Sequence, residues 1–232
     1  MLQIRPAKSL DTADHGWLKA RHHFKVSPEG NPANSPVGSL VVWNDDEIAP
    51  GRGFDFHGHT NMEIISYIRR GAVTHRDTIG SVGLTSAGDV QAMSAGTGIR
   101  HSEFNLGQEP LSLFQIWLRP RHAGGEPHWD SRRFPKTDRA NQLVVLASGF
   151  PEDADALAIG ADARVLGATL LAGSRLTYTT GRLRNAYLAP ALGVVTVNDQ
   201  RLEVGDGIAA YNESTLTIAA EEDAEFILVA TN

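Results

Sequence analysis

Two short stretches of the chain carry histidine and glutamate side chains at a spacing that suits metal binding. His57 and His59 are two residues apart, and so are His101 and Glu103. On an extended strand, residues i and i+2 project from the same face. If the two stretches are neighbouring strands turned toward one interior, three imidazoles and one carboxylate meet at one point. This donor set suits Fe(II), Mn(II), Ni(II), Cu(II) or Zn(II), and the sequence does not choose among these ions.

The absence of cysteine decides which kind of metal site is expected. The chain has no cysteine, which excludes disulfides, thiolate chemistry and the usual closed structural site with thiolate ligands. A carboxylate in a set with open coordination positions favours a catalytic centre. The competing interpretation is that a single His-x-His pair lies on a solvent-facing strand. The second pair, beside the glycine-rich segment 95–98, favours a shared site.

The remaining histidines are expected at the surface or in ordinary hydrogen bonds. They are His15, His22, His23, His75, His122 and His128. Among them, His22 and His23 are candidates for a place near the mouth of a pocket.

Short apolar runs between turn residues predict an all-β chain. The 23 glycines and 11 prolines separate runs that are rich in β-branched residues, and amphipathic helical patterns are scarce. The predicted strands are Val37–Trp43, Glu63–Ile68, Val90–Met93, Leu111–Leu118, Leu143–Ala147, Gly193–Asn198, Thr215–Ala219 and Glu225–Ala230. Segment 151–162 is expected to hold a short helix or a turn.

A weak internal repeat indicates two related domains. The run Gly71–Thr74 is echoed by Gly193–Thr196, and a Gly-Asp pair follows each, at 88–89 and at 205–206. The length of 232 residues accommodates two packed domains, which are expected to join within segment 124–139. Counted from the shared glycines, the counterparts of the four candidate ligands are Thr179, Gly181, Ile218 and Ala220. None of these binds a metal strongly, so the second domain is expected to be metal-free and structural.

Charge and hydropathy limit the classes of partner. The formal net charge is −6, and neither Arg69-Arg70 nor Arg132-Arg133 extends into a longer basic run. Direct nucleic-acid binding and attachment to an anionic membrane both need a clustered basic face, so neither is expected. The N-terminal residues form no long apolar run, and no stretch is long enough to span a bilayer. A cytoplasmic protein is therefore expected.

The same residues resemble the two motifs of the cupin superfamily. Gly51-x5-His57-x-His59-x3-Glu63 is similar to the first motif, although its closing glycine, Gly71, comes one residue late. The second is matched by Gly88, Gly96 and His101-x3-Asn105, with Ser94 in place of the usual proline and two extra residues before the histidine. The chain is identified more narrowly as a member of the pirin family by these stretches: Asp14–Leu18, His57–Glu63, Met93–Glu103 and Gln115–Trp117. Segment 21–25, which is expected near the pocket entrance, departs from the family pattern.

The resemblance implies a bicupin, with two tandem double-stranded β-helix (jelly-roll) barrels. Residues 1–130 would form the N-terminal metal-binding cupin domain, and residues 131–232 a C-terminal cupin domain without metal ligands. Pirin-like proteins bind one divalent metal, usually iron, which carries over to His57, His59, His101 and Glu103. Glu63 is the rival fourth ligand, and Glu103 is preferred because it shares a strand face with His101.

The resemblance also implies an activity, the opening of flavonols such as quercetin by O2, as in quercetin 2,3-dioxygenases. Glu103 would then act as a general base toward the substrate hydroxyl. An apolar wall would hold the flavonol rings, and the candidates for it are Phe54, Phe56, Met93 and Phe114. One alternative is a non-enzymatic, metal- or redox-responsive regulatory protein that binds other proteins. Another is a different cupin reaction, such as sugar isomerisation or another oxygenation. A polar pocket lined by Arg and Lys would point to sugar phosphates.

Overall fold

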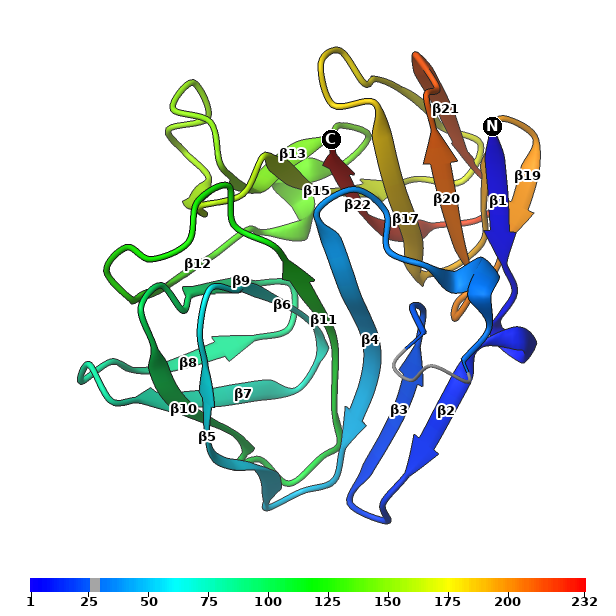
Figure 1. The fold of residues 1–232 in the computed structure, drawn as a ribbon. Helices are drawn as coiled ribbons and strands as arrows, with labels where there is room; N and C mark the ends of the chain where they lie inside the picture. Colours follow the sequence, from blue (N-terminus) through cyan, green and yellow to red (C-terminus); the bar gives the residue numbers. More distant parts are fainter. Residues whose placement is uncertain (26–29) are drawn as a thin grey trace.

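The chain folds into two β-barrels that lie side by side (Figure 1). The computed structural model describes residues 1–25 and 30–232, and its regular elements are β-strands and three short 3-10 helices. The helices are η1 (Ala7–Ser9), η2 (Pro32–Asn34) and η3 (Lys136–Arg139). No helix among the described residues is long and apolar enough to cross a membrane. The prediction of an all-β chain with two cupin-type barrels is therefore confirmed.

The first barrel is made of two sheets. The larger sheet has the order β12-β9-β6-β11-β4-β3-β2, and the smaller has the order β5-β10-β7-β8. The larger sheet contains β2 (Asp11–Asp14), β3 (Leu18–His22), β4 (Leu40–Ile48), β6 (Glu63–Arg70), β9 (Val90–Ser94), β11 (Leu111–Leu118) and β12 (His128–Arg132). The smaller contains β5 (Arg52–His59), β7 (Ala72–Asp77), β8 (Val82–Ser86) and β10 (Ile99–Asn105).

The second barrel has the same two-sheet plan. Its sheets have the orders β1-β20-β17-β22-β15-β13-β14 and β16-β21-β18-β19. The first contains β1 (Leu2–Arg5), β13 (Val144–Ser148), β14 (Leu157–Ala158), β15 (Ala163–Leu170), β17 (Asn185–Leu192), β20 (Gly207–Tyr211) and β22 (Ala224–Thr231). The second contains β16 (Arg175–Thr179), β18 (Val195–Val197), β19 (Gln200–Leu202) and β21 (Thr215–Ala220). Segment 151–162 thus holds a turn and the short strand β14.

Strand exchange ties the two barrels together. Strand β1, drawn in blue in Figure 1, pairs with β20 in the second barrel, although β2 and β3 belong to the first. Segment 124–139, predicted as the joining region, is itself structured, because β12 pairs with β9 and η3 follows. The domain boundary between residues 130 and 131 stays a prediction.

The main apolar core lies between the barrels. The seven-stranded sheets of both barrels contribute buried side chains to this core, among them Trp43, Phe114, Val165, Tyr187 and Ile227. Burying one such side chain contributes about 1.5–3 kcal/mol. Because these sheets are covered on both faces, strands such as β6 and β22 are buried along most of their length. The seven-stranded sheet of the first barrel is therefore packed against that of the second.

The barrel interiors differ in chemistry. The second is filled by one apolar cluster that includes Val195, Val197 and Ile218. In the first, the apolar side chains divide into two smaller clusters, one around Ile68 and one around Met93. Space is therefore left in the first barrel for polar side chains.

The internal repeat corresponds to equivalent turns in the two barrels. Gly71 and Gly193 have φ values of +76° and +70°. A Cβ atom on Gly193 would lie 2.4 Å from the carbonyl oxygen of Asp223, so the turn requires glycine there.

In the second barrel, the predicted counterparts of the four candidate metal ligands, which were counted from these glycines, are partly wrong. Strand pairing places Leu176, not Thr179, opposite Ile218, and Gly181 lies beyond the end of β16. The reason is that the connection from β16 to β17 is longer than the one from β5 to β6. The corrected pair, Leu176 and Ile218, offers no ligand atoms.

Candidate metal centre

Strands β5 and β10 bring three histidines together inside the first barrel. The strands are antiparallel neighbours, and His101 pairs directly with His57. The ring centroids are 4.5 Å apart for His57 and His101, 4.8 Å for His57 and His59, and 5.0 Å for His59 and His101. One ring nitrogen from each lies within 4.8 Å of those of the other two. The geometry expected from the two i, i+2 pairs is therefore present for the imidazoles.

A β-bulge beside His57 shapes this cluster. The register between β5 and β10 shifts between His101 and Glu103, so that Glu103 pairs with Phe54 rather than with Asp55. The main-chain carbonyl of Asp55 accepts a hydrogen bond of 2.7 Å from His57 Nδ1. In a neutral imidazole the proton is then on Nδ1, which leaves the lone pair of Nε2 free for a ligand. Bulges commonly re-aim side chains at functional sites in this way.

The surroundings of His59 and His101 keep these two imidazoles neutral. Burial, reinforced by the neighbouring imidazoles, lowers the pKa of His101 to about 3, and burial and His57 lower the pKa of His59 to about 4. Both ring nitrogens of His101 and the Nε2 of His59 are buried and have no hydrogen-bond partner among the described residues. Such orphaned groups are destabilising unless something satisfies them. A divalent cation, which binds neutral imidazole, fits this arrangement.

Glu103 is buried beside the histidines and is held by amide donors. Gln91 Nε2 donates to Glu103 Oε1 at 2.6 Å, and Gln115 Nε2 donates to Oε2 at 2.8 Å. Ser66 Oγ is a weaker donor to Oε1 at 3.5 Å. Burial raises the pKa of Glu103 to about 7, and these three hydrogen bonds oppose the rise. The carboxylate therefore has a defined position, which suits a ligand.

The structure places a fourth histidine, His75, beside this cluster, although the sequence predicted a surface or ordinary hydrogen-bonded position for it. His75 is fully buried, pairs with Glu103 across β7 and β10, and groups with His101 and Glu103 within 4.8 Å. Its Nε2 lies 3.0 Å from Asp77 Oδ2, which leaves the lone pair on Nδ1, and its ring stacks on Trp129 at 4.7 Å. The expectation of a surface or ordinary hydrogen-bonded residue was therefore incomplete. The His-x-Asp spacing of His75 and Asp77 was the available signal in the sequence.

The rival ligand Glu63 lies away from the histidines. It is buried on β6 and accepts a hydrogen bond from Ser94 Oγ. A Cβ atom on Gly160, in the second half of the chain, would lie 3.0 Å from Glu63 Oε1. Glu63 does not join either group of potential ligands among the described residues. The geometry favours Glu103 over Glu63.

A cavity of about 310 Å³ opens onto His57, His59 and Glu103. Its lining includes His57, His59, Glu103, the apolar side chains Leu18, Phe54 and Trp117, and the polar side chains His15, His22, Asn44, Asp46 and Gln115. His22 lines the cavity as expected for a residue near the mouth. The other candidate, His23, is instead buried between the barrels, where its Nδ1 lies 2.8 Å from the hydroxyl oxygen of Tyr187.

The predicted apolar wall is only partly correct. Phe54 lines the cavity, but Phe56 points outward and is 46% exposed. Met93 belongs to an apolar cluster and Phe114 to the core between the barrels. Trp117, which was not predicted as a wall residue, contacts the cluster edge-on, with its ring 4.9 Å from that of His59. The alternation of β5, altered by the bulge, explains why one phenylalanine faces inward and the other does not.

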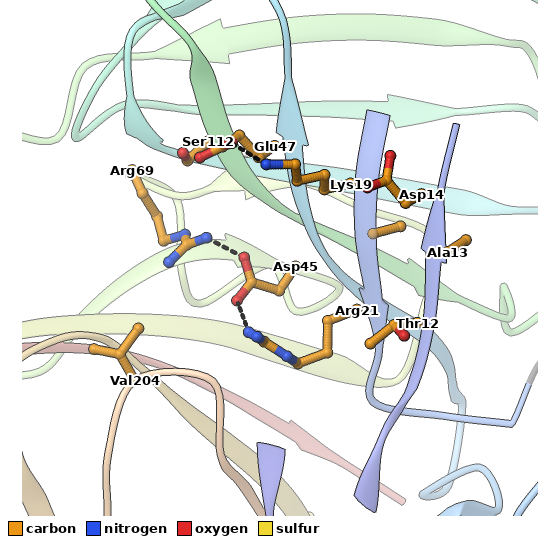
Figure 2. Close-up of a pocket in the computed structure, with 11 residues that line it drawn as sticks. Thr12, Ala13, Asp14, Lys19, Arg21, Asp45, Glu47, Arg69, Ser112 and Val204 are labelled. Atoms are coloured by element: carbon orange, nitrogen blue, oxygen red, sulfur yellow. Dashed lines mark hydrogen bonds and ion pairs between the residues drawn. The ribbon is translucent and has the colours of Figure 1, made fainter. Parts of the chain in front are cut away.

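A second, larger groove of about 620 Å³ lies on the other face of strand β4. Figure 2 shows Asp45 between the guanidinium groups of Arg21 and Arg69, with Lys19 and Glu47 nearby. Arg21 Nη1 lies 3.2 Å from Asp45 Oδ2, and Arg69 pairs with Oδ1. The charges in this groove are largely paired with each other, and none of the described histidines lines it.

Comparison with known proteins gives a consistent match over the whole chain. Residues 3–118 match the family described as Pirin, and residues 145–230 match the Quercetinase C-terminal cupin domain. A pirin-like protein of Caulobacter vibrioides is 56% identical over 229 residues, which is 99% of each chain. A quercetin 2,3-dioxygenase of Escherichia coli strain K12 is 35% identical, over 98% of this chain and 97% of its own.

A solved structure shows the same architecture. The bacterial pirin YhhW from Escherichia coli, in complex with nickel(II), superposes with a TM-score of 0.91 at 34% identity. The superposition covers 100% of this chain and 99% of that one.

Proposed function

The chain belongs to the pirin family of two-barrel cupin proteins, and on this premise we propose that it is a metal-dependent dioxygenase that opens flavonols such as quercetin with O2. One observation carries the proposal. Three clustered imidazoles and a buried carboxylate lie beside a cavity that has an aromatic wall. Relatives described as quercetin 2,3-dioxygenases support the substrate class.

The proposed ligands are His57, His59, His101 and Glu103, and the proposed ion is Fe(II). A relative whose structure is a complex with nickel(II) supports a divalent transition metal as the cofactor. When bound, the ion supplies Lewis acidity that lowers the pKa of a substrate hydroxyl. Neutral imidazoles and a carboxylate are also the donors that Fe(II), Mn(II) and Ni(II) accept, so metal analysis must decide among them.

The residues of the chain supply the remaining steps. Glu103 accepts the hydroxyl proton at a carboxylate oxygen, and the amides of Gln91 and Gln115 keep that carboxylate in position. The rings of Phe54 and Trp117 offer flat apolar contact to the flavonol and exclude water. The cavity volume of about 310 Å³ is at the lower end of the range for small-molecule sites.

The test combines metal analysis with an assay of flavonol consumption. The purified protein is loaded anaerobically with Fe(II), Mn(II) or Ni(II), and quercetin loss and carbon monoxide release are measured in air, with and without chelator. We expect stoichiometric metal and chelator-sensitive turnover. Full metal loading without turnover of any flavonol would contradict the proposal.

A second candidate function, a regulatory protein that binds other proteins, is favoured by one surface. The outer face of the sheet β5-β10-β7-β8 exposes Phe56, Val82, Leu84 and Leu106, the last three by more than 60%. Exposed apolar patches often mark protein interaction sites. Full metal loading without flavonol turnover would favour this candidate.

A sugar phosphate reaction is disfavoured. No lysine or arginine lines the cavity within the part of the chain that the structure describes. A phosphate group would therefore find no cationic partner there.

A further inference from the structure

Asp46 is a buried carboxyl group in the wall of the metal cavity. It lies on β4, where it pairs with Leu113 of β11 and Ala20 of β3, and it is 1% exposed. Asn44, two residues earlier on the same face, also lines the cavity. Asp46 therefore faces the space in which a substrate would sit.

The carboxyl group of Asp46 lacks the partners that its neighbour has. Asp46 Oδ1 is buried and has no hydrogen-bond partner among residues 1–25 and 30–232. Asp45 points to the opposite face of the strand and is clamped by Arg21 and Arg69 (Figure 2). The two adjacent aspartates thus differ in their environment, because side chains alternate along a strand. Asp45 lies in the groove with Arg21 and Arg69, and Asp46 lies in the wall of the metal cavity.

An unpaired buried carboxyl group is costly for the fold. Burial, together with the charges of Asp45 and Glu103, raises the pKa of Asp46 to about 7, while Arg69 opposes the rise. Its strand neighbours Ala20 and Leu113 are apolar, so no adjacent donor on the paired strands compensates it. An uncharged side chain would fit this position at lower cost, which indicates that the carboxyl group serves a ligand.

The buried Oδ1 atom of Asp46 would be satisfied by a hydrogen-bond donor. We propose that Asp46 is a specificity-determining residue, which accepts a hydrogen bond from a hydroxyl of the flavonol other than the one deprotonated by Glu103. This inference rests on the proposed function. Glu103 is already engaged by Gln91 and Gln115, whereas Asp46 has an acceptor free, so the two carboxyl groups can act on different hydroxyls of one substrate. The cavity would then select polyhydroxylated flavonols.

The test compares two ligands that differ in their hydroxyls. Quercetin carries hydroxyls on its outer rings, whereas the only hydroxyl of 3-hydroxyflavone is the one proposed to approach the metal. Dissociation constants are measured anaerobically with metal-loaded wild type, Asp46→Asn and Asp46→Leu. We expect Asp46→Leu to weaken quercetin binding by about ten-fold or more, as for loss of a hydrogen bond to a charged group, with Asp46→Asn in between. Binding of 3-hydroxyflavone should change little.

The control is Glu47→Gln, which removes a carboxylate from the next position of β4, outside the cavity. This variant should bind both ligands like the wild type. The thermal midpoint of Asp46→Asn should equal or exceed that of the wild type, because a costly buried carboxyl group is removed. Equal weakening of both ligands, or no weakening of either, would overturn the role of Asp46 while leaving the proposed function intact. Failure of the wild type to bind either ligand would overturn both.

Discussion

His57 lies directly opposite His101 across the β5–β10 strand pair, with their ring centroids 4.5 Å apart. Direct cross-strand neighbours are held at a distance that the two backbones impose. The bulge next to His57 then directs its Nδ1 to the carbonyl of Asp55. The two imidazoles are thus set in place by the main chain before any metal binds.

Removal of His101 should abolish stable metal binding. We expect His101→Ala to remain folded, as judged by circular dichroism. After dialysis its metal content should be lower than that of the wild type by about ten-fold or more, because a proposed ligand is lost. Metal content is measured by elemental analysis. His122 is exposed, and His122→Ala is the matched control, which should keep full metal. Stoichiometric metal in folded His101→Ala would refute the ligand assignment.

The amide that holds Glu103 should affect metal affinity without being a ligand. In Gln91→Leu the 2.6 Å hydrogen bond to Glu103 Oε1 is lost. We expect the metal to bind about 10–100-fold more weakly, as is typical when a group that orients a ligand is removed. Competition with a chromophoric chelator measures the affinity. Gln108→Leu, at an exposed position, should match the wild type, and equal affinities for all three proteins would contradict this role.

His23 should make the metal-free protein less stable in mild acid. Full burial between the barrels lowers its pKa to about 3 from an ordinary value of 6.5. Between these values the unfolded chain takes up a proton that the folded protein does not. The free energy of unfolding therefore falls as the pH falls, by about 1.4 kcal/mol per pH unit for this group.

The comparison of His23→Asn with the wild type isolates this contribution. From pH 6.5 to 4.5 the wild type should lose about 2–3 kcal/mol relative to His23→Asn. Urea unfolding of both proteins in chelator gives the two free energies at each pH. The exposed variant His122→Asn should run parallel to the wild type. A constant difference between wild type and His23→Asn over this range would show that His23 is protonated in the folded protein.

Gly96 should be intolerant of a side chain. Its φ of +47° disfavours any other residue, and a Cβ atom would lie 2.3 Å from the carbonyl oxygen of Gly125. We expect Gly96→Ala to lower the free energy of unfolding by about 2 kcal/mol or more, since conformational strain and a clash add together. Gly124 also has a positive φ, of +86°, but open space around it, so Gly124→Ala should cost only about 1 kcal/mol. Thermal and urea unfolding measure both, and equal losses would show that the contact with Gly125 is unimportant.

Features that depend on local periodicity can be predicted from the amino-acid sequence of this chain. The period of two along a strand places His57 with His59, and His101 with Glu103, whatever the fold around them. Turn residues and β-branched runs predict the all-β class, and the repeated runs at 71–74 and 193–196 indicate two related barrels.

The identity of neighbouring strands could not be predicted in this way, because strand pairing depends on contacts between residues far apart in sequence. The tertiary structure brought His75 next to Glu103 and sent Glu63 elsewhere. The longer connection after β16 shifted the counted counterparts of the ligands, and the bulge on β5 turned Phe54 inward. The environment of Asp46 could not be predicted from any local sequence pattern. Its neighbour Asp45 meets two guanidinium groups, while Asp46 faces a cavity that exists only once the first barrel has closed.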